Sequence, residues 1–377
     1  MTLRPSRVAF FPLRCEVDPS GELEASRAFL NILRREPTSI EVVNLSQVGA
    51  LSRGRISLLL GNLNRIAGMR AALRSSSCDL AIIKIPTPAQ IAPLRPLLVD
   101  FKGPVVFWCD SLCFDFPPLG LGLRLLTREP LLTGARAFLN GRSWLRLGGP
   151  PGRWVVVATQ VQRAQLVGLG WDPSFIRVIP NSSTLASADS LARPAAPSAA
   201  NAALRMGYIG HLDSVKGVSD LVKSLQELRK GSTPFSFHFA VSPLSSREAI
   251  PKFDDPRIRI STAVDRVRYL SNLDLLALPY WANWGTNIIP TVLLEAMNLG
   301  VPVLTPDTAL SREVLGDDYQ GLYARNDGMA LFRAIQNMLT DPGRRPSGLA
   351  LRDRFAALYS PRKVEEAWLS FLHQTLA

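Results

Sequence analysis

Apolar runs alternate with amphipathic stretches along most of the chain. The runs at 7–12 (RVAFFP), 80–85 (LAIIKI) and 104–109 (PVVFWC) are almost wholly apolar, as strands buried on both faces of a parallel sheet are. Stretches of helical length and period separate such runs, among them Leu23–Arg35 and Val161–Leu169. This alternation predicts a doubly wound α/β domain. The other strands expected in it lie at 40–44, 153–159 and in F-I-R-V-I-P-N-S-S, which ends at Ser183.

Residues 184–203 interrupt this pattern. They are rich in Ala, Ser and Pro and almost lack large apolar side chains, which predicts a linker. The alternation then restarts with a strand at 204–210, a helix at Gly217–Lys230 and a helix at Thr291–Leu299 that Gly300 ends. Further strands are expected at 235–241, 257–261, 273–279 and 301–306, and a last helix at Ser360–Ala377. Two α/β domains in tandem predict a cleft in which a ligand binds at the carboxyl ends of the strands.

Composition narrows the class of protein. The chain has 377 residues, 47% hydrophobic and 20% charged, which excludes global disorder. No stretch approaches the roughly 18–20 apolar residues of a membrane span, and the apolar run near the N-terminus is too short for a signal peptide. The four cysteines, Cys15, Cys78, Cys109 and Cys113, show no zinc-site or disulfide spacing. Free thiols in a reducing cytoplasm are therefore expected.

Positive charge is concentrated in the first half. The net charge is +12, and residues 1–180 hold 22 basic and 12 acidic side chains against 21 and 19 in the rest. Leu51–Ser77 and Leu119–Arg153 combine arginines with apolar residues, as segments that lie on an anionic bilayer do. The alternative interpretation of these arginine-rich segments is a helix face exposed to solvent. Nucleic acid is not expected as a partner, because aromatic residues are not interleaved with the arginines and no binding motif is present.

Candidate chemistry lies in the second half. In Y-I-G-H-L-D-S-V-K-G, a strand leads into a glycine-containing turn, and Lys216 precedes the next helix. A lysine at this position can neutralise a diphosphate, and His211 can donate a second hydrogen bond. An ordinary strand-to-helix loop with a surface lysine is the alternative.

The helix expected at Thr291–Leu299 holds a single ionisable residue. Glu295 is the only acid or base between Asp274 and Asp307, and an unpaired carboxylate in an apolar helix costs several kcal/mol unless it is hydrogen-bonded. Ribose hydroxyls could supply those bonds, and so could nearby backbone amides. The first backbone N–H groups of the helix, at Thr291 and Val292, suit a phosphate.

These residues belong to a longer pattern. G-x-L-x-x-x-K-G after a strand, then L-P, then P-T-V-L-L-E-A-M-x-x-G-x-P-V and the acid Glu313 resemble glycosyltransferase family 4. The resemblance is strong over 204–340 and weaker over 1–183. It implies the GT-B fold, with two Rossmann-like doubly wound domains facing a central cleft. The domains implied are an acceptor domain at 1–183, a linker at 184–203, a donor-binding domain at 204–357 and a helix at 358–377 that crosses back to the first domain.

The resemblance also implies an activity and a set of residues. The expected activity is retaining, metal-independent transfer of a sugar from a nucleotide-sugar to a hydroxyl acceptor, with no cofactor because the nucleotide-sugar is a substrate. The acceptor is expected to be a sugar, a small molecule or a lipid-linked or polysaccharide intermediate, and the enzyme to be cytoplasmic, peripheral on the inner face of the membrane. Lys216, His211 and Asn287 are expected to be catalytic. The donor-binding residues implied are Gly21, Lys216, Thr286, Asn287, Ile288, Thr291, Val292 and Glu295.

The chain departs from the family pattern at two positions. Asn287 stands where the first acid of Glu-x7-Glu is usual, and His211 stands where Arg is common. These changes remove one negative and one positive charge from the donor site. A catalytically weak partner subunit with the same fold is therefore an alternative function. A third alternative is an inverting enzyme that uses Asp110 as its base, since Asp110 is the acceptor-side candidate.

Overall fold

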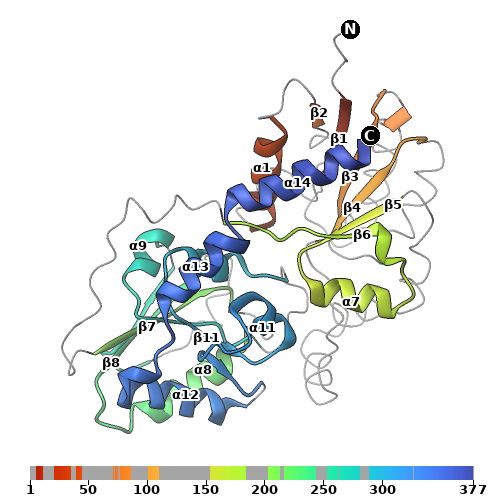
Figure 1. The fold of residues 1–377 in the computed structure, drawn as a ribbon. Helices are drawn as coiled ribbons and strands as arrows, with labels where there is room; N and C mark the ends of the chain where they lie inside the picture. Colours follow the sequence, from red (N-terminus) through yellow and green to blue (C-terminus); the bar gives the residue numbers. More distant parts are fainter. Residues whose placement is uncertain are drawn as a thin grey trace, which may run out of the picture.

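The described strands form two parallel sheets of six strands each (Figure 1). The structure, a computed structural model, describes residues 6–11, 21–34, 40–44, 71, 73–74, 77–85, 101–109, 153–183, 203–212, 216–242, 253–262, 264–280, 288–325 and 327–376. All strand pairs within the sheets are parallel. The predicted doubly wound α/β architecture is therefore confirmed.

The first sheet has the strand order β2-β1-β3-β4-β5-β6. Its strands are β1 (Ser6–Phe11), β2 (Ile40–Asn44), β3 (Leu80–Ile85), β4 (Val105–Cys109), β5 (Arg153–Val157) and β6 (Ile176–Val178). The helices described with it are α1 (Gly21–Arg34), α7 (Gln160–Gly168) and the short 3-10 turn η2 (Pro173–Phe175). The expected strands and helices are present within about two residues, with Thr159 capping α7 through a reciprocal bond with Gln162.

The second sheet has the order β12-β11-β10-β7-β8-β9, so its first strand in sequence lies at the centre. Its strands are β7 (Leu204–Gly210), β8 (Phe235–Val241), β9 (Ile258–Ser261), β10 (Leu275–Ala277), β11 (Val303–Pro306) and β12 (Leu322–Tyr323). Its helices are α8 (Val218–Leu228), α9 (Arg266–Ser271), α10 (Thr291–Asn298), α11 (Ala309–Leu315), α12 (Gly328–Thr340), the turn η6 (Pro342–Arg344) and α13 (Gly348–Leu358). The chain reverses direction across the sheet between β7 and β10, and such switch points are where doubly wound sheets bind ligands.

The last helix belongs with the first sheet. α14 (Pro361–Leu376) follows the second sheet in sequence but packs its apolar face in the core of the first (Figure 1). Trp368 is 2% exposed, and its ring centroid lies 4.5 Å from that of Phe29 on α1 and 5.2 Å from that of Trp108 on β4. Burial of such large aromatic side chains stabilises the packing strongly. Helix α14 therefore links the second half of the chain to the core of the first sheet.

Helix α10 stops where the sequence predicts. Gly300, just after the helix, adopts φ +64°, a left-handed conformation that costs an L-residue roughly 1–2 kcal/mol. A Cβ at this position would also lie 3.1 Å from the carbonyl oxygen of Gly348 in α13.

We therefore expect Gly300→Ala to lower the free energy of unfolding by about 2 kcal/mol, because backbone strain and crowding against α13 add. Urea unfolding followed by circular dichroism measures it. The matched control is Gly231→Ala, where φ is not left-handed and a Cβ would meet its nearest atom at 3.5 Å. Equal stability of the two variants would contradict the account of this helix end.

Candidate functional site

Lys216 lies at the switch point of the second sheet. It follows β7 and directly precedes α8, whose N-cap Gly217 has φ +65°. The side chain is 9% exposed, and its Nζ lies 4.2 Å from the ring centroid of Tyr280, which follows β10. β7 and β10 are neighbouring strands, so the lysine and the tyrosine meet across the point where the sheet changes direction. A buried ammonium at this edge can attract an anion strongly. The expectation of a surface lysine is thus excluded.

The N-terminus of α10 opens on the same edge of the sheet. Pro290 is the N-cap residue and has no side chain that can accept a hydrogen bond from the first turn. Helix N-termini of this kind present backbone N–H groups and a partial positive charge. Thr291 and Val292, both half-buried, begin the helix, and Ile288 is buried just before it. These residues stand where the sequence analysis places them, at a site suited to an anion.

Glu295 lies one turn into α10 and has a partner that the sequence does not reveal. Its side chain is 1% exposed, and its Oε1 lies 2.9 Å from Nη1 of Arg266, the first residue of α9. The ion pair compensates part of the desolvation cost of the carboxylate. The expectation of a lone carboxylate that depends on ligand hydroxyls or backbone amides is therefore wrong in this respect, because Arg266 comes from a distant part of the sequence.

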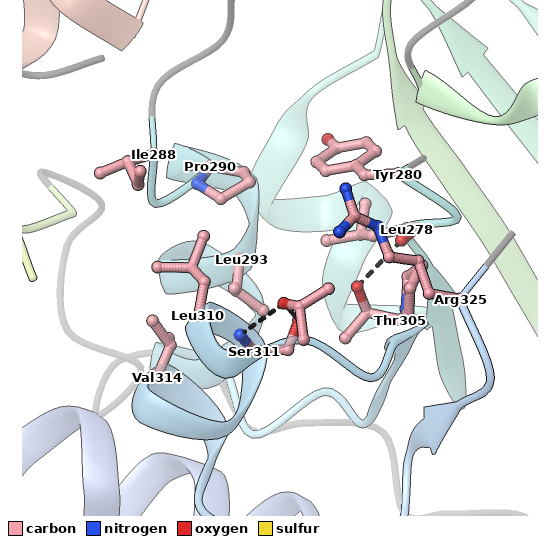
Figure 2. Close-up of a pocket in the computed structure, with 12 residues that line it drawn as sticks. Leu278, Tyr280, Ile288, Pro290, Leu293, Thr305, Leu310, Ser311, Val314 and Arg325 are labelled. Atoms are coloured by element: carbon pink, nitrogen blue, oxygen red, sulfur yellow. Dashed lines mark hydrogen bonds between the residues drawn. The ribbon is translucent and has the colours of Figure 1, made fainter. Parts of the chain in front are cut away.

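A pocket lies where β10, β11 and β12 end, beside the N-termini of α10 and α11 (Figure 2). Apolar side chains and four hydroxyl-bearing residues form most of its wall. Thr305 uses its hydroxyl to donate to the Leu278 carbonyl at 3.0 Å, and Thr308 caps α11 by accepting from the Ser311 backbone N–H at 3.0 Å. The lining residues are Leu278, Tyr280, Ile288, Pro290, Leu293, Thr305, Pro306, Thr308, Leu310, Ser311, Val314 and Arg325.

The other expected site residues fall in three groups. His211 follows β7 but its side chain is exposed, while its carbonyl oxygen accepts a hydrogen bond from the Tyr208 hydroxyl. Gly21 is the first residue of α1, at the helix start that follows β1. Thr286, Asn287 and Asp110 lie outside the described residues. The structure thus brings Lys216, Ile288, Thr291, Val292 and Glu295 to one edge of the second sheet, and does not turn the imidazole of His211 inward.

Sequence reasoning missed Tyr280, Arg266 and Arg325. Tyr280 follows β10, a strand that the sequence predicts, and this position at a carboxyl end was the available signal. Arg325 follows β12, whose two residues give no recognisable pattern. Arg266 carried no such signal, since it begins a helix of six residues whose pattern is too short to recognise.

A carboxylate joins the two halves of the molecule. Glu313 on α11 accepts hydrogen bonds from the backbone N–H groups of Gln160 and Val161, at 2.6 and 2.8 Å, in the first turn of α7. A negative charge at a helix N-terminus is favourable. At the crossover segments, the Ser182 hydroxyl donates to the Tyr359 carbonyl at 2.6 Å. Because Leu310, Ser311 and Val314 of the same helix line the pocket, α11 connects the pocket to the first half.

We expect Glu313→Ala to loosen the contact between the halves, because two hydrogen bonds to a charged group are lost. At this partly exposed position the loss is about 1 kcal/mol. Small-angle scattering should then show a larger radius of gyration with unchanged secondary structure. Glu366→Ala is the control, since Glu366 pairs only with nearby exposed side chains of α14 among the described residues. An unchanged radius of gyration in Glu313→Ala would contradict this role.

Shifted pKa values mark buried groups outside the pocket lining. Burial raises the pKa of Tyr359 to about 12, and burial also raises that of Tyr323 well above its usual range, so both phenols stay protonated. Burial, and then the nearby charge of Arg259, lower the pKa of His238. His238 shares a hydrogen bond of 2.9 Å with Ser261. It is therefore a neutral structural histidine at neutral pH, as its place in a strand predicts.

Residues 203–341 match the family model "Glycosyl transferases group 1". This part of the chain is a glycosyl transferases group 1 domain. It contains β7 to β12 and every described residue of the pocket, so the family resemblance found in the sequence is confirmed for the second half. No curated protein matches the chain at a significant level.

Solved structures resemble the whole chain in fold. Sucrose-phosphate synthase from Thermosynechococcus elongatus has a TM-score of 0.68 at 16% identity, covering 98% of each chain. HepE from Anabaena, solved in complex with UDP-glucose, has a TM-score of 0.64 at 15% identity, covering 98% of this chain and 99% of its own. WaaG, a glycosyltransferase involved in lipopolysaccharide biosynthesis, has a TM-score of 0.62 at 16% identity, covering 95% and 98%. These likenesses establish the GT-B fold.

Three further observations concern the described part of the chain. No helix in it has the length and apolarity needed to cross a bilayer. No group of three or more His, Cys, Asp or Glu side chains gathers there as a metal site requires. Among the described residues, Cys78 and Cys109 form no disulfide.

Proposed function

We propose that the protein is a retaining glycosyltransferase that moves a sugar from a nucleotide-sugar donor to a hydroxyl acceptor. The observation that carries the proposal is the buried Lys216 beside Tyr280 at the switch point of the second sheet, with the N-terminus of α10 at the same edge of the sheet. Both lie within the glycosyl transferases group 1 domain. The UDP-glucose complex of the similarly folded HepE supports a nucleotide-sugar as the donor.

The chain's own residues have separate tasks in this reaction. Lys216 and the backbone N–H groups of Thr291 and Val292 hold the diphosphate as it takes up negative charge on leaving, which is electrostatic stabilisation by preorganised donors. Glu295, kept in place by Arg266, accepts hydrogen bonds from the ribose hydroxyls. The acceptor hydroxyl attacks the sugar on the face that the diphosphate leaves, and the departing phosphate oxygen takes its proton. The protein therefore needs no strong base and no metal.

The domain roles follow from the same proposal. Residues 1–183 bind the acceptor, 184–203 link the domains, 204–357 bind the donor, and 358–377 return to the acceptor domain. The packing of α14 against α1 and β4 supports the last assignment. Movement about the linker would close the cleft and exclude water.

The proposed acceptor is a lipid-linked or polysaccharide intermediate at the inner face of the membrane. The excess of basic residues in 1–180 supports it, although Leu51–Ser77 and Leu119–Arg153 lie almost wholly outside the described residues. Flotation with phosphatidylglycerol vesicles should recover the protein at low salt, and phosphatidylcholine vesicles should not. Equal recovery on both would remove this support.

The test of the function is turnover of a donor panel. The purified chain is incubated with UDP-, GDP- and ADP-sugars, nucleotide release is measured, and the anomeric configuration of the product is read by NMR. The proposal predicts release from one donor and a product that retains the donor configuration. An inverted product would favour the Asp110 mechanism instead. Nucleotide binding without turnover would favour a partner subunit, the alternative that the outward-facing His211 supports.

A further inference from the structure

We propose that Arg325 is a second cationic ligand of the donor diphosphate. This inference rests on the function proposed above and adds a residue to its donor site. The sequence leaves the site short of one positive charge, because His211 stands where an arginine is usual, and the structure leaves the imidazole of His211 exposed. Arg325 offers a guanidinium at the same edge of the sheet from a different strand.

The position of Arg325 follows from the sheet order. The residue comes just after β12, which pairs with β11, which in turn pairs with β10. The carboxyl ends of these three strands form the pocket wall. The Arg325 side chain is half-buried and extends from the end of β12 into the pocket, toward the side where Tyr280 lies (Figure 2).

Tyr280 connects this arginine with Lys216. Its ring lines the pocket together with Arg325, and the ammonium group of Lys216 lies 4.2 Å from the same ring centroid. Lys216, which follows β7, thus contacts the tyrosine, and Arg325, which follows β12, lines the same pocket as the tyrosine. A diphosphate carries several negative charges on two phosphorus centres, so two separated cations match it better than one.

The surroundings of Arg325 strengthen its attraction for phosphate. Among the described residues that line the pocket, Arg325 is the one with a positive charge, and the rest are apolar, hydroxyl-bearing or proline. Charge interactions are stronger where water is partly excluded. The planar guanidinium can also bind two phosphate oxygens at once, which a lysine cannot do. We infer that Arg325 contacts the phosphate that distinguishes a nucleoside diphosphate from a monophosphate.

The experiment measures the preference for diphosphate over monophosphate. UDP, GDP and ADP, and the matching monophosphates, are titrated calorimetrically into the wild-type protein, Arg325→Gln and Arg325→Lys. Loss of a charged hydrogen bond corresponds to about 10- to 100-fold in affinity. We expect Arg325→Gln to weaken binding of the diphosphate by that factor and to change the affinity for the monophosphate less than threefold. Arg325→Lys should recover part of the lost diphosphate affinity. Arg333→Gln, an exposed position on α12, removes the same charge away from the pocket and should leave both affinities unchanged.

The possible outcomes distinguish failure of the Arg325 inference from failure of the proposed function. If the wild type binds a diphosphate and Arg325→Gln binds it equally well, Arg325 is not a diphosphate ligand and the proposed function stands. Equal weakening of diphosphate and monophosphate also overturns the inference, since it would show a general effect on the pocket. If the wild type binds none of the six nucleotides, the proposed function fails and the inference fails with it. Thermal unfolding of each variant shows whether it is folded at the temperature of the titration.

Discussion

Replacing Lys216 with alanine is expected to lower kcat/KM for the donor by a factor on the order of 10² to 10³. This is the size of effect seen when one preorganised donor to a developing negative charge is removed. The buried ammonium beside Tyr280 acts in a partly dehydrated setting, so solvent cannot replace it. Nucleotide release from the preferred donor measures the effect.

A matched lysine controls for the loss of charge. Lys223 lies in α8, the helix that follows Lys216, and its side chain is exposed. Lys223→Ala should therefore retain wild-type activity. Lys216→Arg keeps a positive charge and should restore a part of the lost rate. Activity of Lys216→Ala within threefold of wild type would remove the lysine from the donor site.

The second large effect concerns the ion pair between Glu295 and Arg266. Arg266→Ala should destabilise the protein by roughly 2 kcal/mol, because it leaves a carboxylate that is 1% exposed without this partner. The expected value is below that of a fully buried pair, since the arginine is 41% exposed. Urea unfolding measures the change. Glu295→Gln should instead weaken donor binding by about tenfold or more, through loss of charged hydrogen bonds to the ribose.

The double variant separates stability from binding. With Glu295→Gln present, adding Arg266→Ala no longer strands a charge, so the double variant should be more stable than Arg266→Ala alone. Additive stability losses would show that the two side chains do not depend on each other. Unchanged donor affinity in Glu295→Gln would show that the carboxylate serves the fold only.

The fold was largely predictable because its strands are buried on both faces. Near-continuous apolar runs such as 80–85 and 204–210 mark such strands, and Gly300 marks the end of α10 through its left-handed backbone. The pattern missed β12 and α9, which have two and six residues, too few for a period to appear. Helices α11, α12 and α13 were not predicted either, although α12 has 13 residues and α13 has 11.

The candidate site was predictable only where its residues follow recognisable elements. Lys216 follows a long strand and Glu295 lies inside a predicted helix, so both could be singled out from the sequence, and both are buried in the structure. Arg266 begins α9 and Arg325 follows β12, two elements that were not predicted, and the partner of Arg266 is Glu295 in a different helix. The ion pair of Glu295 joins residues of different helices, and such a contact cannot be read from the periodicity of either segment. Thr286, Asn287 and Asp110 lie outside the described residues, so their roles stay predictions.

The most direct measurement of the central claim is a calorimetric titration of the wild-type protein and Lys216→Ala with UDP, GDP and ADP. Our account predicts that one nucleoside diphosphate binds the wild type and raises its thermal stability by mass action. The same nucleotide should bind Lys216→Ala at least tenfold more weakly. No binding of any nucleotide to the wild type, or equal affinity in the variant, would contradict a donor site at the switch point of the second sheet.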